Sequence, residues 1–394
     1  MNPVPTLNLG MSPAAFLARH WQKRPLLIRA GFQNFRDPLS PEELAGLACE
    51  PEVESRLVLG SSTRGWELRH GPFAEAAFTE LPALDWSLLV QDVDKHLPAL
   101  ADDFLEPFRF VPDWRIDDLM VSYAVTGGSV GPHLDSYDVF LVQGLGRRRW
   151  EIGEPLDNPT LHPDLPLRIL ADFRPTHTWE LQAGDMLYLP PGVPHHGVAL
   201  EPCLTYSVGF RSPAVAELLM DLAGEVDPDW RYRDPDLTLP EHPGKLDAEA
   251  VARVRRLLET ALARIDDDAL GDWFARVVTS PKLAFTARAL DHPFDETGLL
   301  TELSAGEVLE RNPGSRWAFR ESDDGIILHV DGRAWPLHMR LAPLVRLVCA
   351  QRRLDRAALG SLLEEPTARQ QLLALVNEGY LLIYDDEEGS APEP

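Results

Sequence analysis

Residues 184–197 have the sequence GDMLYLPPGVPHHG. The Gly184-Asp185 pair predicts a turn, because both residues adopt turn conformations at low cost. The apolar run at 186–189 predicts a short strand, and the prolines at 190–194 predict a stiff loop that ends in a histidine. This stretch therefore places a candidate metal ligand beyond the end of an apolar strand.

Short strands separated by glycine and proline surround that stretch. The expected strands cover residues 119–125, 137–143, 147–152, 178–181, 186–189, 197–200 and 205–210. We expect 147–152 to be the hairpin partner of 137–143, because only three residues, Gly-Leu-Gly, separate them. Strands at this spacing predict an antiparallel barrel or jelly roll over residues 117–210.

The N-terminal segment mixes helix and strand signals. Ser12 followed by Pro13 predicts a helix start, and Ser40 with Glu43 predicts a second start with a capping box. Residues 25–29 form an apolar run that predicts a strand. We expect this segment to cover one side of the core that the later strands form.

After residue 213 the pattern becomes helical. Helices are expected over 214–223 and 247–265, with a proline-rich loop at 227–243 between them. The second helix carries an apolar stripe, namely Val251, Val254, Leu257, Leu258, Ala261 and Leu262. Such a stripe packs within its own chain or in a dimer.

The C-terminal part, about residues 300–384, mixes strands and helices. Asp331-Gly332 predicts a hairpin between the apolar runs 326–330 and 333–337. Helices are expected over 342–352, 356–363 and 367–377, and a strand over 379–383. This combination resembles a winged helix, and the acidic residues 385–394 are expected to be disordered.

The chain has 394 residues, enough for two or three domains, and a formal net charge of -25. A charge of this sign repels phosphate backbones, so unspecific nucleic-acid binding is not expected. The same charge would attract a basic protein partner, although a general solubility effect explains it equally well.

The cysteines and the apolar segments indicate where the protein works. Cys49, Cys203 and Cys349 are odd in number and far apart, so no disulfide framework or zinc motif is expected. No apolar stretch approaches ~20 residues, so no membrane span is expected. Residues 1–10 contain no basic segment followed by an apolar run, which argues against a secretory signal. We therefore expect a cytoplasmic protein.

Residues 131–138 have the sequence GPHLDSYD and contain a second metal-ligand signal. In an extended segment His133 and Asp135 point the same way, so the two side chains can share one metal. A third ligand must come from elsewhere, and His195 is the favoured candidate. His196 competes with it, but neighbouring strand residues face opposite sides, so only one should bind.

Two imidazoles and one carboxylate on one face form the facial triad of non-haem iron(II) oxygenases. Zinc accepts the same ligands, so the residue types alone leave the metal open. A single His-x-Asp pair is more commonly a surface pair. Its combination with the pattern at 184–197, in a strand-rich segment, favours a metal site.

The three arginines at 147–149 supply the cation that a co-substrate with two carboxylates would need inside a barrel. Alternation sends Arg148 to one face of the strand and its two neighbours to the other. A planar guanidinium binds a carboxylate with two hydrogen bonds, while the alternative is a solvated basic hairpin. Ser207 and Tyr123 are candidate hydroxyl partners.

These motifs together resemble those of the JmjC-type ribosomal oxygenases, in particular the bacterial branch that hydroxylates an arginine of the sixteenth large-subunit ribosomal protein. The resemblance rests on residues 117–120, 131–140, 143–150, 190–197 and 206–211. The order of segments along the whole chain also resembles that family's order of a JmjC domain, a helical dimerisation region and a winged helix.

The resemblance implies an α+β architecture with a double-stranded β-helix (cupin/JmjC) core. The implied domains are a catalytic domain at 1–212, a helical dimerisation region at 213–298, a winged-helix-like domain at 299–386 and a disordered acidic tail at 387–394. It also implies a homodimer, and a winged helix that does not read DNA.

The resemblance further implies an iron(II)- and 2-oxoglutarate-dependent dioxygenase that hydroxylates an arginine side chain of a basic ribosomal protein. His133, Asp135 and His195 would bind the iron. Arg148 would bind the distal carboxylate of 2-oxoglutarate.

A guanidinium substrate needs acidic or aromatic walls, and Asp118, Tyr137 and Asp138 are expected near the mouth of the barrel. Other interpretations stay open: another JmjC oxygenase, such as a histidine hydroxylase or an N-methyl demethylase, a metal cupin without oxygenase activity, or a DNA-binding sensor. The predicted helix at 367–377 argues against the sensor, because Arg369 is its one basic residue.

Overall fold

The apolar runs between residues 117 and 210 form antiparallel strands that belong to two sheets. The structure is a computed structural model that describes residues 6–61, 65–156, 158–163, 165, 167–322 and 325–384. The chain divides into two units, 1–212 and 213–394, and both of these sheets lie in the first unit.

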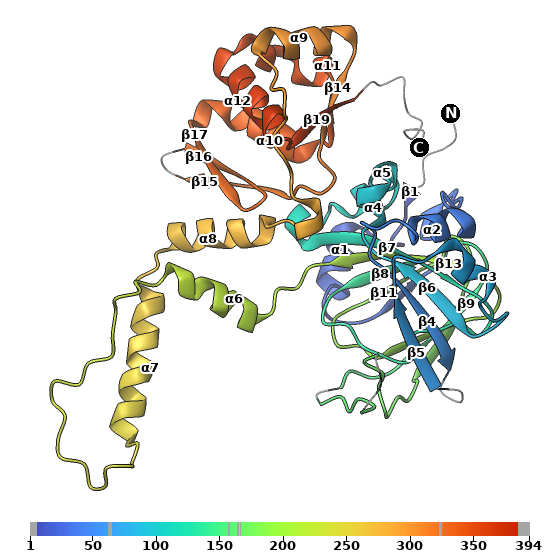
Figure 1. Cartoon of the computed structure of the whole chain (residues 1–394), viewed down its shortest axis with the longest axis horizontal. Helices are drawn as coiled ribbons and strands as arrows, with labels where there is room; N and C mark the ends of the chain where they lie inside the picture. The colour runs from blue at the N-terminus through green and yellow to red at the C-terminus, as the bar shows by residue number, and fades with distance from the viewer. Residues whose placement is uncertain are drawn as a thin grey trace. The chain divides into compact units, whose positions relative to one another are not determined.

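The larger sheet of the first unit has eight strands and curves around the interior of the unit (Figure 1). Its order is β2 (Leu26–Ile28), β11 (Met186–Leu189), β8 (Val139–Gln143), β13 (Cys203–Phe210), β7 (Ile116–Ala124), β6 (Trp86–Val90), β4 (Ser55–Ser61) and β5 (Gly65–His70). The smaller sheet has the order β10 (His177–Leu181), β9 (Arg148–Ile152) and β12 (His195–Ala199).

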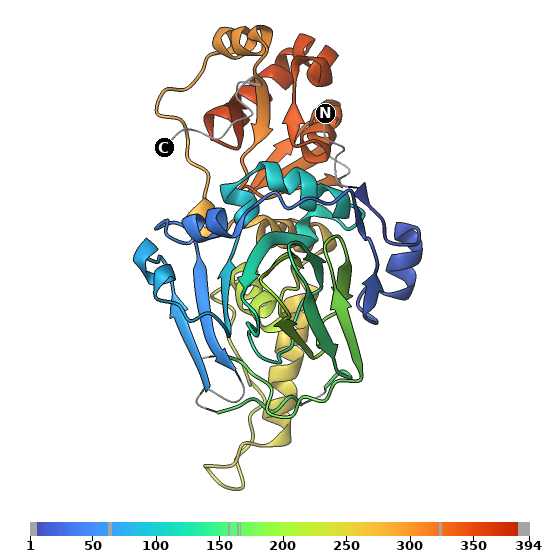
Figure 2. The same cartoon turned by 90° about the vertical axis from the view of Figure 1, so that its right-hand side faces the viewer.

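The inner faces of the two sheets pack against each other and make a β-roll, which confirms the predicted fold class (Figure 2). Leu141 of β8 and Leu187 of β11 belong to one buried cluster with Trp150 and Ile152 of β9. Because strand residues alternate, every second side chain of these strands lines the interior of the roll. This interior contains the candidate site.

The outer face of the larger sheet is covered by N-terminal helices. These are α1 (Pro13–Arg19), α2 (Pro41–Leu47), α3 (Glu75–Thr79), α4 (Val93–His96) and α5 (Ala99–Phe104), with short β1 (Thr6–Leu7), β3 (Phe32–Gln33), η1 (Glu106–Phe108) and η2 (Asp113–Arg115) nearby in sequence. In the outer core Phe104 stacks on Tyr206, and Phe16 packs against Tyr188. The predicted caps are present, since Ser12 accepts the Ala15 N–H and Ser40 forms a capping box with Glu43.

One predicted strand pairing is wrong. β9 does not form a hairpin with β8: it pairs with β10 and β12, whereas β8 pairs with β11 and β13. Gly146, at φ 69°, turns the chain from one sheet to the other, and a Cβ there would lie 2.1 Å from the Pro202 carbonyl oxygen. Strands adjacent in sequence are therefore on opposite walls of the roll.

The N-terminal segment does more than cover the core. Besides its helices it contributes β2, β4, β5 and β6 to the larger sheet, and β6 pairs directly with β7. The expectation of a covering segment is incomplete, because residues 55–61 and 86–90 form strands that were not among those expected.

The second unit begins with helices and ends in a winged helix, as predicted. The helical elements are α6 (Val215–Leu222), η3 (Ala223–Glu225), α7 (Ala248–Ala263), α8 (Asp267–Thr279), η4 (Leu283–Phe285), α9 (Glu296–Ala305), η5 (Met339–Leu341), α10 (Ala342–Ala350), α11 (Arg356–Leu359), η6 (Gly360–Glu364) and α12 (Pro366–Asn377). Two sheets have the orders β18 (Arg353–Leu354), β14 (Val308–Arg311), β19 (Leu381–Tyr384) and β15 (Trp317–Ser322), β16 (Gly325–Val330), β17 (Arg333–Leu337).

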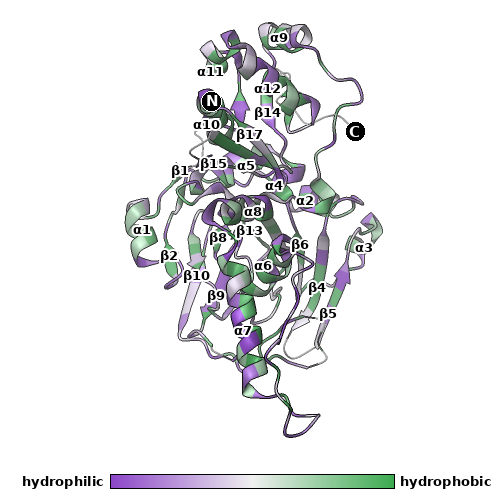
Figure 3. Ribbon diagram, turned by 90° about the vertical axis from the view of Figure 1, so that its left-hand side faces the viewer, coloured by the Kyte–Doolittle hydropathy of each residue, from purple (hydrophilic) through white to green (hydrophobic). Residues whose placement is uncertain are grey.

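Two features of this unit bear on the predictions. The β16–β17 hairpin turns at Asp331 and Gly332, whose φ values of 49° and 75° fit the predicted tight turn. Helix α7 contains no buried residue, and Figure 3 shows hydrophobic and hydrophilic residues on it.

The acidic segment 385–394 lies outside the described residues. No helix in the described part of the chain is long and apolar enough to cross a membrane.

Candidate metal centre

His133 and His195 are brought together by backbone pairing. His195 is the first residue of β12, and His133 lies in the segment between β7 and β8. The His133 N–H donates to the His195 carbonyl at 3.0 Å, and the His195 N–H donates to the His133 carbonyl at 2.8 Å. Directly paired antiparallel residues point the same way, so the two ring centroids lie 4.2 Å apart.

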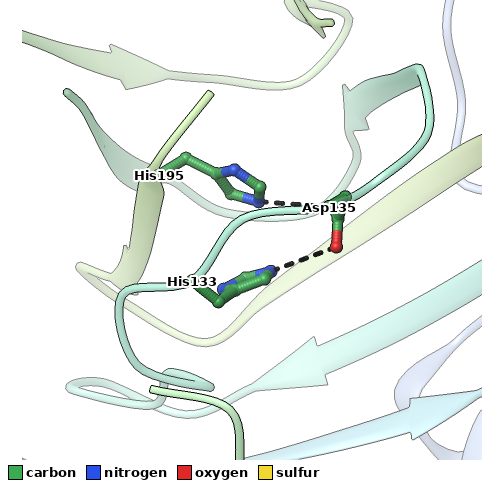
Figure 4. Close-up of side chains that lie close together, drawn as sticks. All are labelled: His133, Asp135 and His195. Atoms are coloured by element: carbon green, nitrogen blue, oxygen red, sulfur yellow. Dashed lines mark ion pairs between the residues drawn. The ribbon is translucent and has the colours of Figure 1, made fainter. Parts of the chain in front are cut away.

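Asp135 completes a cluster of three side chains (Figure 4). Its Oδ1 lies 4.0 Å from His133 Nε2, and its Oδ2 lies 3.6 Å from His195 Nε2. The three potential ligand atoms all lie within 4.8 Å of one another, and no other such cluster occurs among the described residues. The structure therefore brings together the three residues predicted to hold a metal.

Backbone carbonyls set the tautomers of both histidines. His133 Nδ1 lies 3.0 Å from the Gly131 carbonyl oxygen, and His195 Nδ1 lies 3.0 Å from that of Val193. A carbonyl only accepts, so each Nδ1 carries the proton and each Nε2 presents a lone pair to a metal. Burial and the neighbouring His133 lower the pKa of His195 to about 4, which keeps its imidazole neutral.

His196 faces the other way, as alternation along β12 requires. Its Nδ1 lies 3.2 Å from Glu151 Oε2, and its ring packs edge-on against Phe173. The structure therefore brings His195, and not His196, to the cluster. One face of the metal would be held by two imidazoles and a carboxylate, which leaves the opposite octahedral positions open for ligands.

Arg148 extends from β9 into the interior of the roll. It is 3% exposed, lies over the Trp150 ring at 5.1 Å and donates to the Gly197 carbonyl at 3.3 Å. Among the described residues, no carboxylate forms an ion pair with Arg148, and its Nε has no hydrogen-bond partner. Burial lowers the pKa of this guanidinium. An unpaired buried cation is costly, so an anionic ligand would stabilise this position.

The two predicted hydroxyl partners have different positions. Ser207 pairs with Leu141 of β8, whose side chain packs in the interior of the roll. Tyr123 pairs with Leu204 on the outer face, where its ring packs against Trp86. The structure does not bring Tyr123 to the site, because its strand position has the wrong parity for the inner face.

Thr205 is an interior hydroxyl that the sequence analysis missed. It is buried beside Gln143 and Ser122 in the sheet, and its Oγ1 has no hydrogen-bond partner among the described residues. The signal was available, because Thr205 is two residues from Ser207 on the same strand and therefore shares its face.

Tyr137 lies beside the metal-ligand cluster, and the charge of Asp118 acts on Tyr137. The Tyr137 hydroxyl donates a hydrogen bond to Asp135. Burial of the hydroxyl and the charges of Asp135 and Asp118 raise the pKa of Tyr137 far above its usual range. The Tyr137 residue as a whole remains 43% exposed. Asp118 is buried and accepts the Asp92 N–H at 3.3 Å. An aromatic side chain thus lies beside the cluster, and a buried carboxylate acts on that side chain through its charge.

Asp138 faces the outer core. Its side chain is fully buried and accepts from the Tyr188 hydroxyl at 2.6 Å, from Gln22 Nε2 at 3.0 Å and from Arg115 at 3.2 Å. Tyr188 packs in the outer core. The structure does not bring Asp138 to the metal-ligand cluster, because its side chain turns toward that core.

Family models match both units of the chain. The JmjC domain model matches residues 103–218, and the ROXA-like winged helix model matches residues 259–382. A third model, the AraC-like ligand binding domain, matches residues 176–269. The β-roll and its His-x-Asp…His cluster thus define a JmjC-domain protein.

A curated relative specifies the family. The chain is 40% identical over 371 residues to the ribosomal protein uL16 3-hydroxylase of Escherichia coli (strain K12), and the match covers 93% of this chain and 96% of the relative. The chain therefore belongs to the JmjC-type ribosomal oxygenases, as the motifs predicted.

Solved structures agree with this assignment. The X-ray structure of E. coli ycfD has a TM-score of 0.81 and 38% identity, and the match covers 96% of this chain and 100% of that one. The structure of YcfD, a ribosomal oxygenase from E. coli, in complex with cobalt and 2-oxoglutarate has a TM-score of 0.79 and 38% identity, with coverage of 97% and 100%.

Proposed function

We propose that this chain is an iron(II)- and 2-oxoglutarate-dependent dioxygenase that hydroxylates an arginine side chain of a large-subunit ribosomal protein. The observation that carries the proposal is the His133–Asp135–His195 cluster in the same roll as the buried, unpaired Arg148. The relative that is named as a uL16 3-hydroxylase, and the related structure with cobalt and 2-oxoglutarate, support the same assignment.

The residues of the site fit both an iron ion and 2-oxoglutarate. His133 and His195 offer Nε2 lone pairs and Asp135 offers a carboxylate oxygen, which is the donor set that non-haem iron(II) accepts. Arg148 would bind the distal carboxylate of 2-oxoglutarate, with Thr205 and Ser207 as hydroxyl donors.

Iron(II), when bound with 2-oxoglutarate and dioxygen, supplies the oxidative chemistry. One oxygen atom enters an unactivated C–H bond of the substrate and the other enters succinate, with release of carbon dioxide. The protein itself holds the ligands, orients the co-substrate and keeps water out of the interior. Trp150 and Ile152 contribute to that exclusion, because both are buried in the inner cluster beside the site.

Asp118 and Tyr137 are the proposed contacts for the substrate guanidinium. A carboxylate can accept two parallel hydrogen bonds from a guanidinium, and an aromatic ring can stack on its face. The Tyr137 hydroxyl contacts Asp135 and the charge of Asp118 acts on Tyr137, so an arginine bound between them would present its carbon chain to the metal. The net charge of -25 also favours a basic protein substrate.

The proposal is tested by incubating the full chain with iron(II), 2-oxoglutarate and the unmodified ribosomal protein. We expect one added oxygen atom on a single arginine, located by fragment-ion mass spectrometry, with an equal amount of succinate. The Asp135→Ala variant should form neither product. Absence of succinate and of any mass change with the unaltered chain would remove the oxygenase assignment, and formaldehyde release would indicate demethylation instead.

We also propose that the chain forms a homodimer through helix α7. Its apolar stripe includes Val251, Val254, Leu258 and Leu262, which are between 45% and 61% exposed. Light scattering after chromatography should give twice the chain mass, and Leu258→Glu should give the single-chain mass. A monomer at all concentrations would contradict this part of the proposal.

Three further assignments follow from the family. The proposed domains are the catalytic domain at 1–212, the dimerisation region at 213–298 and the winged-helix domain at 299–386. A ribosomal protein substrate would place the enzyme in the cytoplasm. No role in reading nucleic acid is proposed for the winged helix, since Arg369, the basic residue of α12, pairs with Glu296 at 2.5 Å.

A further inference from the structure

The loop between β9 and β10, residues 153–176, contains two anomalously buried side chains. Most of its described residues from 154 onward are exposed or half-buried, yet Ile169 and Leu170 are each 2% exposed. Neither belongs to the hydrophobic clusters of the roll. A surface loop buries branched apolar side chains only when another part of the chain covers them.

The chain segment that meets Ile169 and Leu170 is Gly131-Pro132, directly before the first histidine. The Leu170 N–H donates to the Pro132 carbonyl at 2.8 Å. A Cβ on Gly131 would lie 2.8 Å from Ile169 Cδ1 and 3.2 Å from the Trp66 ring, so Gly131 is enclosed between these side chains. Its φ of 79° also favours glycine.

The loop is stiffened where it makes these contacts. Leu161 and Leu170 form an isolated β-bridge. The His162 N–H donates to the Ile169 carbonyl at 2.9 Å, and the Ala171 N–H donates to the Thr160 carbonyl at 2.9 Å. The loop therefore presents Ile169 and Leu170 from a short paired structure.

The two histidines of the metal cluster are supported differently. The carbonyl that holds His195 belongs to Val193, which is 3% exposed and part of the inner hydrophobic cluster. The carbonyl that holds His133 belongs to Gly131, which has no side chain to anchor it. His133 itself has a side chain that is 25% exposed, against 3% for His195. His133 thus depends on contacts from outside the roll.

We propose that Ile169 and Leu170 are positioning residues for His133. They fix Gly131-Pro132, the Gly131 carbonyl then fixes Nδ1–H of His133, and Nε2 is held toward Asp135. Partners of metal-binding histidines of this kind change metal affinity by ~10- to 100-fold when they are removed. The inference rests on the metal role of His133 in the proposed function. It assigns a positioning role to the loop 153–176, which contains none of the three metal ligands.

The test compares Ile169→Ala with the matched control Leu156→Ala, a half-exposed leucine of the same loop. Titration with cobalt(II) should show at least ~10-fold weaker binding for Ile169→Ala, with binding by the control and by Ile169→Val close to that of the unaltered chain. Equal cobalt(II) affinity of Ile169→Ala and the unaltered chain would overturn the proposal.

A second readout needs no metal. Nitrogen-15 NMR of labelled histidines in the metal-free chain should show that Ile169→Ala loses the fixed Nδ1–H tautomer of His133 and keeps that of His195. Gly131→Ala, whose Cβ would displace Ile169, should give the same selective change. Loss of the fixed tautomer at both histidines would mean that the loop supports the whole roll. That result would overturn a specific role of Ile169 and Leu170 in positioning His133.

The two tests separate this inference from the proposed function. If the unaltered chain binds no cobalt(II), the metal-centre assignment fails. The His133 tautomer in the metal-free variants still decides whether the loop positions that ring.

Discussion

Arg148 is the residue whose surroundings indicate most clearly that a ligand is missing from the interior. Its guanidinium is buried without a carboxylate partner among the described residues, and the nearby strand β13 presents Thr205 with an unpaired hydroxyl. Buried polar groups are nearly always satisfied in a folded protein. A dicarboxylate that reaches from the metal to Arg148 would satisfy both groups.

Arg148→Met should raise the KM for 2-oxoglutarate about 100-fold, which corresponds to about 2.7 kcal/mol, because two charge-assisted hydrogen bonds are lost. Succinate formation over a range of 2-oxoglutarate concentrations measures this. The control is Arg147→Met, because Arg147 lies on the outer face and pairs with Glu201 at 3.1 Å. Equal KM values for the two variants would contradict the role of Arg148.

Asp118→Asn should raise the KM for the protein substrate about 10-fold or more, because a neutral amide cannot pair with a guanidinium as a carboxylate does. The turnover of 2-oxoglutarate without substrate should stay unchanged. The measurement is hydroxylation rate against substrate concentration, and an unaltered KM would remove Asp118 from the site.

Asp138→Asn is expected to act on stability instead. Its buried carboxylate accepts from three side-chain donors, so the free energy of unfolding should fall by about 2 kcal/mol. Denaturant unfolding measures the loss. A large rise in substrate KM with unchanged stability would show that the outer-core assignment of Asp138 is mistaken.

At the scale of elements, alternation along β9 and β12 brings the site together. Arg148, Trp150 and Ile152 pair with Ala199, Gly197 and His195, and all six positions face the interior. Gly197 leaves room for the neighbours, since a Cβ there would lie 2.7 Å from both Arg148 Nε and the Trp150 ring.

Gly197→Ala should therefore displace Arg148 and raise the KM for 2-oxoglutarate by about 10-fold, the range expected for overpacking of a buried site. Cobalt(II) affinity should stay within a factor of about two, because overpacking at this position acts on Arg148 and not on the metal ligands. Measuring both quantities on one preparation checks the prediction. An unchanged KM, or a loss confined to cobalt(II) binding, would contradict it.

The local signals in the sequence were the predictable part of this fold. Ser40 with Glu43, the Asp331-Gly332 turn and the apolar strand at 186–189 all appear as predicted, because each depends on neighbours in the chain. The pairing of β9 was not predictable from proximity in sequence, since its partners come from the other side of a 24-residue loop and from β12.

The same distinction applies to the site. Arg148 could be placed by counting along a strand, because alternation decides its face. His133 and Asp135 could be predicted as a pair from their spacing, although they lie between β7 and β8 and not on a strand. Tyr123 and Asp138 were misplaced, since their faces depend on which side of the larger sheet the helices cover. Ile169 and Leu170 carry no sequence signal that links them to residue 131, because that contact forms only in the folded chain.

At the scale of the molecule, the candidate metal centre belongs entirely to the first unit, and the second unit has its own hydrophobic core. Metal binding should therefore stabilise one unit and leave the other unchanged. With cobalt(II) at about 100 times its Kd, linkage predicts about 2.7 kcal/mol of added stability for the first unit.

Calorimetry of the full chain with and without cobalt(II) checks this. We expect one unfolding transition to move to higher temperature and another to stay in place, and no shift in the His195→Ala variant. A shift of both transitions together, or the same shift in His195→Ala, would disagree with a centre confined to the first unit.

The most direct test of the account is anomalous diffraction from crystals grown without oxygen, with iron(II) and 2-oxoglutarate present. We expect one iron peak among His133 Nε2, Asp135 and His195 Nε2, with 2-oxoglutarate extending from the iron to Arg148. An iron peak elsewhere, or an iron bound by His196 in place of His195, would contradict it.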